Sequence, residues 1–125
     1  MDAKRMFLGA TRATIGVGGW LAPDLTARAF GFDPARSDRF VTRLFAAREL
    51  ALAGALLTAS PKHLPAVAAI GAAVDTADAI GGLDEARRGN VSTFTFVSGV
   101  LGAVLFAALG ARIAQEASRD AGGDL

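Results

Sequence analysis

The sequence predicts an all-α protein: a transmembrane bundle of four helices with up-down topology. Three observations lead to this fold class. Hydrophobic residues make up 52% of the 125-residue chain, which is high for a soluble domain of this size. Four apolar segments follow one another along it, each about as long as a helix that crosses a bilayer. Residues that begin or end helices stand between these segments, so we expect four separate helices.

Each of the four apolar segments is bounded by residues that commonly begin or end helices. The segments cover residues 6–22, 40–59, 64–83 and 91–111. Pro23 and Asp24 follow the first segment, Asp33, Pro34 and Ser37 precede the second, Ser60 and Pro61 begin the third, and Gly89 and Asn90 separate the third from the fourth.

Two further segments complete the predicted architecture. Residues 25–32 predict a short helix at the membrane interface, with Arg28 reaching water, and the alternative is a loop with two buried phenylalanines. After residue 114, charged residues alternate with glycine and serine. We therefore expect residues 1–114 to form the membrane domain and residues 115–125 a flexible polar tail.

A soluble four-helix bundle is the main alternative, because only the fourth segment is free of charge over eighteen positions. Such a bundle needs a broad polar face on every helix. The second segment instead carries leucines on several sides, and the fourth has no charged residue between Asn90 and Arg112. We therefore expect a multi-pass protein of the inner (plasma) membrane. Its expected partners are the lipid bilayer and either a second copy of the chain or a larger membrane complex.

Composition argues against several function classes. The net charge is only +1, without a basic stripe, so nucleic acid is not an expected partner. The chain has no cysteine, and its single histidine, His63, has no second histidine at ligand spacing. We therefore expect no metal and no cofactor. No nucleophile and base can be paired from the sequence, so no catalytic residue and no enzymatic activity are expected.

The charged residues inside the apolar segments form the candidate site. Residues equally far from a shared turn lie at one depth in an up-down bundle, which places Glu49 level with Asp75. An isolated charge at that depth costs several kcal/mol, so we expect the charges to pair inside the bundle. Asp75 and Asp78 share a helix face, and Arg48 is the candidate to fork between them. The predicted polar cluster comprises Arg12, Arg43, Arg48, Glu49, Asp75, Asp78, Thr95 and Ser98.

Two functions stay open for this cluster. It is either a salt-bridge lock that fixes helix register, or a site within the membrane for a proton, an ion or a polar headgroup. The lock predicts a non-enzymatic accessory or assembly component. The site predicts a small proton- or ion-coupled transporter or channel that uses Asp75 and Asp78.

Small residues recur every four positions on the second and fourth segments. Such stripes let helix backbones approach closely in lipid. The alternative is that alanine is simply common in this chain. The predicted packing residues are Ala47, Ala51, Ala55, Gly99, Ala103 and Ala107.

Three stretches carry a family resemblance: Leu-Ala-Pro-Asp-Leu-Thr-Ala-Arg at 21–28, Arg-Leu-Phe-Ala-Ala-Arg-Glu-Leu at 43–50, and Ala-Val-Asp-Thr-Ala-Asp-Ala at 73–79. Together they resemble a family of small four-span membrane proteins of unknown function, common in actinobacteria. The family's Arg-Glu pair and Asp-x-x-Asp motif fall here on Arg48, Glu49, Asp75 and Asp78. The resemblance implies four spans and the charged cluster, but no reaction.

Overall fold

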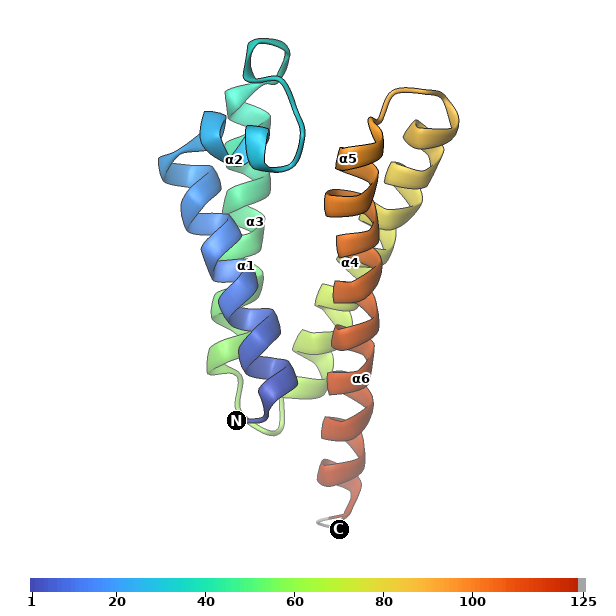
Figure 1. Ribbon diagram of the computed structural model, residues 1–125. Helices are drawn as coiled ribbons and strands as arrows, with labels where there is room; N and C mark the ends of the chain where they lie inside the picture. The colour runs from blue at the N-terminus through green and yellow to red at the C-terminus, as the bar shows by residue number, and fades with distance from the viewer. Residues whose placement is uncertain (124–125) are drawn as a thin grey trace.

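Four long helical stretches run alternately in opposite directions in the computed structural model, which describes residues 1–123 (Figure 1). This part of the chain is all-helical, without a strand. The last three elements, of which the middle one is a π-helical turn, follow one another without a break. In order, the elements are α1 (Ala3–Leu21), α2 (Pro23–Ala29), the 3-10 turn η1 (Pro34–Arg36), α3 (Arg39–Thr58), α4 (Leu64–Arg87), α5 (Thr93–Thr95), η2 (Phe96–Val100) and α6 (Leu101–Gly123).

The helices form two arms that meet at one end and diverge at the other (Figure 1). The first arm consists of α1, α2 and α3, and the second of α4, α5, η2 and α6. Within each arm the long helices pack along their length, whereas contacts between the arms are sparse. We call the end with the N-terminus and the α3–α4 link the closed end, and the opposite end the open end.

Side-chain caps explain why the helices begin where they do. The carboxylate of Asp2 accepts a hydrogen bond from the amide of Arg5, and that of Asp38 from the amide of Phe40. Gly89 follows the end of α4 with a φ of 79°, a conformation that glycine adopts readily. The prediction that the four apolar segments are helical is confirmed.

The apolar core lies at the closed end. One residue from each long helix contributes to it, namely Leu8, Leu56, Ala68 and Ile113. Arg5 donates to the carbonyl oxygens of Leu56 and Ala59, both at 2.7 Å, and so satisfies the C-terminal end of α3. This end of the molecule is therefore held by both apolar and polar contacts.

Glycines on α1, rather than the predicted alanines on α3, bring the helices of the first arm together. A Cβ atom on Gly16 would lie 2.6 Å from Cγ of Leu50, and one on Gly19 would lie 2.9 Å from Cβ of Ala46. The predicted alanine stripe on α3 makes no close approach to another helix of the chain, because it points outward, and packing against another chain stays a prediction. Its members Ala47, Ala51 and Ala55 are all exposed.

On the second arm, the residue that brings the two helices close together is a glycine outside the predicted stripe. Gly110 of α6 lies against α4, where an added Cβ would be 3.2 Å from Cβ of Ala72. Gly99 and Ala103 instead line a cleft between the arms, and Ala107 is half-buried.

Helix α6 continues through Gly123, where the sequence predicted a flexible polar tail from residue 115. Ile113 and Ala117 are buried, and Arg112 donates to Glu116 at 3.0 Å one turn further on. Glu116 also pairs with Lys4 of α1 at 3.2 Å. These contacts explain the extra turns, and residues 124 and 125 lie outside the described residues.

The short helix predicted after the first long helix is present as α2, and the phenylalanines that follow it are not buried. Phe30 is half-buried and Phe32 is 51% exposed.

Two helices of the described chain, α4 and the continuous helix Thr93–Gly122, are long and apolar enough to cross a membrane. Only 22% and 17% of the residues in their apolar windows are buried. Helices α1 and α3 do not reach the same standard of composition, because α1 carries three charged residues and α3 carries four. Length and composition therefore indicate two candidate spans in the described chain, α4 and the last helix.

Candidate functional site

Arg12 is the centre of the buried charges, and it joins all four long helices. It is 1% exposed, and its Nη1 donates to Oε2 of Glu49 on α3 at 2.9 Å. Its Nη2 forms an ion pair with Oδ2 of Asp75 on α4, and the ring of Phe106 on α6 lies 5.1 Å from Cζ. We call Arg12, Glu49 and Asp75 the Arg12 triad.

The Arg12 triad is sealed from solvent. Glu49 and Asp75 are each 2% exposed. Gly71, one turn before Asp75, makes room for the guanidinium, since an added Cβ would lie 3.3 Å from Nη2 of Arg12. Buried charges are tolerated only when they are paired in good geometry, and here each carboxylate has its own contact with the guanidinium.

A second ion pair, Arg48 with Asp78, lies beside the triad and is only half-buried. Arg48 binds Asp78 through two contacts, of 3.2 Å from Nη1 and 2.5 Å from Nη2, and also lies 3.8 Å from Glu49. Its guanidinium stacks on Phe45, 5.0 Å from the ring centre. Its Nε is buried without a hydrogen-bond partner in residues 1–123. We call Arg48 and Asp78 the outer pair.

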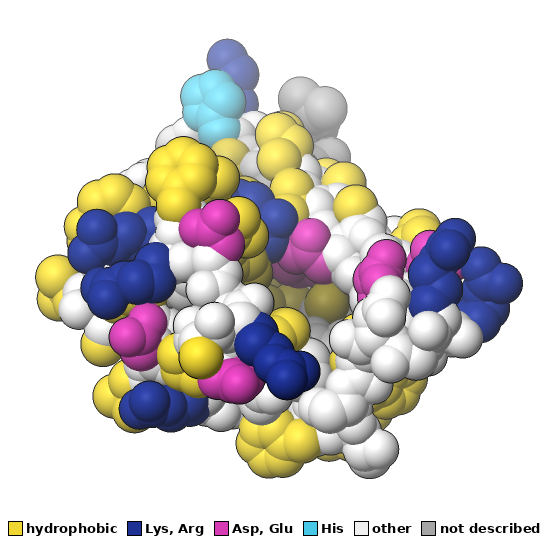
Figure 2. All heavy atoms as spheres, turned by 90° about the horizontal axis from the view of Figure 1, so that it is seen from above, with side chains coloured by type: hydrophobic (Ala, Val, Ile, Leu, Met, Phe, Trp, Pro, Cys, Tyr) yellow, Lys and Arg dark blue, Asp and Glu magenta, His cyan; other side chains and the backbone are white. Residues whose placement is uncertain are grey.

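A cleft of about 1020 Å³ separates the two arms and reaches both groups of charges. Figure 2 looks into the molecule from the open end and shows the hollow, with acidic side chains beside it. Arg48 and Asp78 belong to its lining, as do Glu49 and Asp75 beneath them. The charged cluster therefore forms the floor of a cavity that opens toward one end of the molecule.

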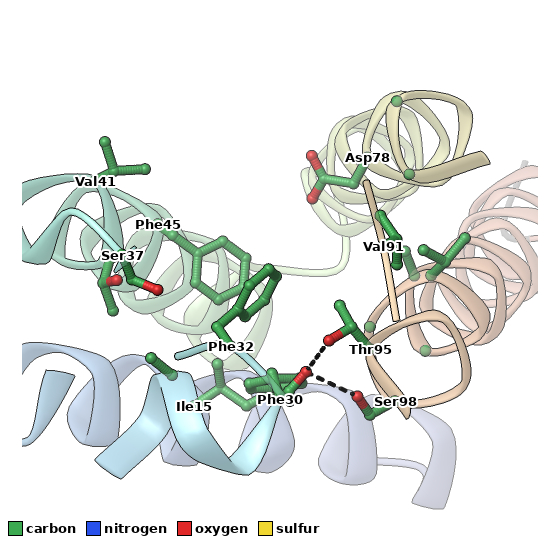
Figure 3. Close-up of a pocket in the computed structure, with 18 of the residues that line it drawn as sticks. Ile15, Phe30, Phe32, Ser37, Val41, Phe45, Asp78, Val91, Thr95 and Ser98 are labelled. Carbon is green, nitrogen blue, oxygen red and sulfur yellow. Dashed lines mark hydrogen bonds between the residues drawn. The ribbon is translucent and has the colours of Figure 1, made fainter. Parts of the chain in front are cut away.

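The walls of the cleft are mainly apolar. Phe30, Phe32 and Phe45 line the side of the first arm, and in Figure 3 the rings of Phe32 and Phe45 lie across the cavity from Asp78. None of these phenylalanines belonged to the predicted site, because the sequence gives no signal that the arms diverge. A large apolar cavity with a few polar groups is the usual form of a small-molecule site.

One side of the cleft is closed by contacts between the arms. The carbonyl oxygen of Phe30 accepts hydrogen bonds from the hydroxyls of Thr95 at 2.7 Å and Ser98 at 3.4 Å (Figure 3). Gly31 has a φ of 84°, and an added Cβ would lie 2.7 Å from Oγ1 of Thr95. The loop after α2 can therefore approach α5 only because a glycine stands there.

The segment Phe96–Val100 is π-helical and lies beside this contact. The amide of Leu101 donates to the carbonyl of Phe96, which widens the turn by one residue. Such turns are rare and occur often at functional sites, so this turn is a second indication that the cleft has a function.

The structure brings together five of the eight residues of the predicted cluster and corrects three details. Arg48 does not fork between the two aspartates, because Arg12 holds Asp75. Arg43 lies elsewhere, with its guanidinium 5.4 Å from the ring of Trp20 and its Nε donating to the Trp20 carbonyl at 3.3 Å. Thr95 and Ser98 line the cleft but bind the Phe30 carbonyl rather than the charges.

No group of three or more histidine, cysteine or acidic side chains in residues 1–123 could hold a metal ion. Nδ1 of His63 and the hydroxyl of Ser60 form a hydrogen bond of 2.8 Å, and this exposed contact lies within the α3–α4 link, outside the lining of the cleft.

No protein-family model, curated protein or solved structure matches the chain. The likeness to small actinobacterial membrane proteins therefore stays a prediction from the sequence.

Proposed function

We propose that the chain is a multi-pass protein of the inner membrane with four spans, acting without catalysis as an accessory or assembly component. In this proposal the Arg12 triad is a lock that holds the two arms in register. The sides of the helices face the bilayer, and the chain also binds either a second copy of itself or a larger membrane complex.

The distribution of polar and apolar side chains carries this proposal. Large apolar residues are exposed along α1, α3, α4, η2 and α6, whereas the charged side chains of the Arg12 triad are almost fully buried. In water this arrangement would expose extensive apolar surface, which soluble proteins avoid. In lipid it is favourable, because the ionised groups face the interior and are paired. The exposed apolar residues include Phe7, Val17, Leu21, Leu44, Ile70, Ile80, Val97, Leu101, Val104 and Leu105.

Extraction of membranes from cells that express the full chain tests the membrane placement. Carbonate at high pH and urea should leave the protein in the membrane pellet, whereas detergent should release it. Recovery of most of the folded chain in the carbonate supernatant would contradict the proposal.

A small ion-coupled transporter or channel is a second candidate, favoured by the cleft that reaches the outer pair. Asp75 is buried against Arg12, so in this second candidate function the carboxylate that would bind the ion is Asp78, whose side chain is 35% exposed. Flux through proteoliposomes should then be lost in Asp78→Asn while the protein stays folded. Equal flux in the variant and the natural chain would exclude this role for Asp78.

A further inference from the structure

The charges at the floor of the cleft do not balance. The Arg12 triad and the outer pair contain two guanidiniums and three carboxylates, so together they carry one negative charge when ionised. Arg43 would have made the set neutral, but it lies against Trp20 instead. The outer pair is neutral, so the excess negative charge belongs to the Arg12 triad, which is almost fully buried. An uncompensated charge at a buried place is costly, so the floor attracts positive charge.

The mouth of the cleft adds to the acidic excess. Asp38 and Glu85 line it, and the basic residue among its lining there is Arg36. The side chain of Arg36 is 89% exposed and lies 4.0 Å from Asp33, which offsets its charge. Over its whole depth the cleft therefore favours a cation over an anion.

The aromatic wall indicates what kind of cation fits. The faces of phenylalanine rings attract positive charge, and Phe32 and Phe45 stand across the cavity from Asp78 (Figure 3). The guanidinium of Arg48 already lies over the ring of Phe45, so a small hydrated ion would leave Phe32 without a partner. A cation that carries apolar groups would contact the ring of Phe32 and the carboxylate together, and a cleft of about 1020 Å³ has room for one.

We propose that the cleft binds one lipophilic monovalent organic cation between the ring of Phe32 and the Arg48–Asp78 pair, on the side of Asp78. The cation supplies the positive charge that the floor lacks, and its apolar groups cover that ring. This inference rests on the proposed membrane placement only in that the bilayer concentrates such molecules near the cleft. Binding itself is a property of the purified chain.

Equilibrium dialysis of the full chain in detergent against tetraphenylphosphonium tests this proposal. Binding should saturate at one cation per chain, and tetraphenylborate, which has the same shape and the opposite charge, should not bind saturably. Asp78→Asn should weaken binding at least about tenfold, because the floor then becomes neutral. Arg48→Gln should strengthen it, because the floor then carries two negative charges.

Asp84→Asn is the matched control, with the same chemical change on the same helix. Asp84 binds Arg87 at 2.7 Å and Arg88 at 3.0 Å outside the cleft, so tetraphenylphosphonium binding should not change. Equal affinity for tetraphenylborate would overturn the proposal. So would an Asp78→Asn variant that melts like the natural chain and still binds the cation as tightly.

Phe32→Leu keeps the proposal testable if Asp78→Asn does not fold. Phe32 is 51% exposed and lies outside the buried core, so its replacement should leave folding intact and weaken binding about threefold or more. Unchanged binding in a folded Phe32→Leu variant would overturn the proposed position of the cation. The membrane placement is tested by the separate extraction experiment. If carbonate extracts the chain and the chain still binds the cation, the membrane placement is overturned and the cation site is not.

Discussion

Arg12 of α1 and Asp75 of α4, 63 residues apart in the sequence, form a sealed ion pair that joins the two arms. Glu49, the other partner of Arg12, lies on the same arm as Arg12 itself. Within the Arg12 triad, the pair with Asp75 is therefore the contact that holds one arm to the other, and the outer pair joins the arms beside it.

Arg12→Met should prevent stable folding. It leaves Asp75 buried without a cation and Glu49 with only the distant Arg48, at 3.8 Å, and breaking a buried pair in this way costs about 3–5 kcal/mol. Adding Glu49→Gln and Asp75→Asn removes the stranded charges and should restore much of the loss. Thermal melting in detergent, followed by size-exclusion chromatography, measures all of these variants.

Arg43→Gln is the control for that series. Arg43 is exposed against Trp20, so its replacement should change the free energy of unfolding by no more than about 0.5 kcal/mol. If Arg12→Met melts like Arg43→Gln, the triad is not a lock.

Two glycine substitutions should shift stability in opposite directions. Gly16→Ala places a Cβ 2.6 Å from Leu50 and should cost about 1–3 kcal/mol through overpacking. Gly54→Ala meets nothing within 4 Å on α3 and should stabilise the helix by about 0.5–1 kcal/mol. Thermal melting compares them, and a stabilising Gly16→Ala would contradict the close approach of α1 to α3.

Labelling of single introduced cysteines should show four spans. The natural chain has no cysteine, so only the introduced one can react. Ala3→Cys and Ala121→Cys should react with an impermeant maleimide from one side of the membrane. Ala35→Cys and Asn90→Cys should react from the other, because both lie at the open end. If Ala35→Cys reacts from the same side as Ala3→Cys, then α1 and α3 do not cross, and only α4 and the last helix do.

Thr95→Val should loosen one side of the cleft. It removes the hydroxyl that donates to the Phe30 carbonyl at 2.7 Å, a bond worth about 1 kcal/mol. Hydrogen exchange should become faster in the loop of residues 30–33 and stay unchanged in α4. Thr95→Ser keeps the hydroxyl and should exchange like the natural chain, so equal acceleration in both variants would show that the hydroxyl is not the cause.

The helices and the depth of the charges could be predicted from the sequence, because both depend on distance along the chain. Apolar runs set the helices, and counting from shared turns placed Glu49 level with Asp75. Rotation about the helix axis is a separate property. Arg43 and Arg48 are five residues apart, which turns one side chain about 140° from the other, so both cannot face the interior.

The cleft could not be predicted, because it depends on how far the two arms diverge. Local contacts of single residues between the arms, such as the approach of Gly31 to Thr95, limit that divergence. The same holds for the choice of Arg12 over Arg48 as the partner of Asp75. Depth allows either pairing, and the space beside Gly71 accommodates the guanidinium of Arg12.

The wide turn at Phe96–Val100 acts as a one-residue insertion that rotates everything before it relative to α6. Each residue of a helix turns the chain by about 100°. Deleting one residue from this turn would restore a regular helix and swing Thr95 away from the Phe30 carbonyl, while Gly110 kept its place against α4. A change in length at this point would therefore re-aim one wall of the cleft and leave the closed end as it is.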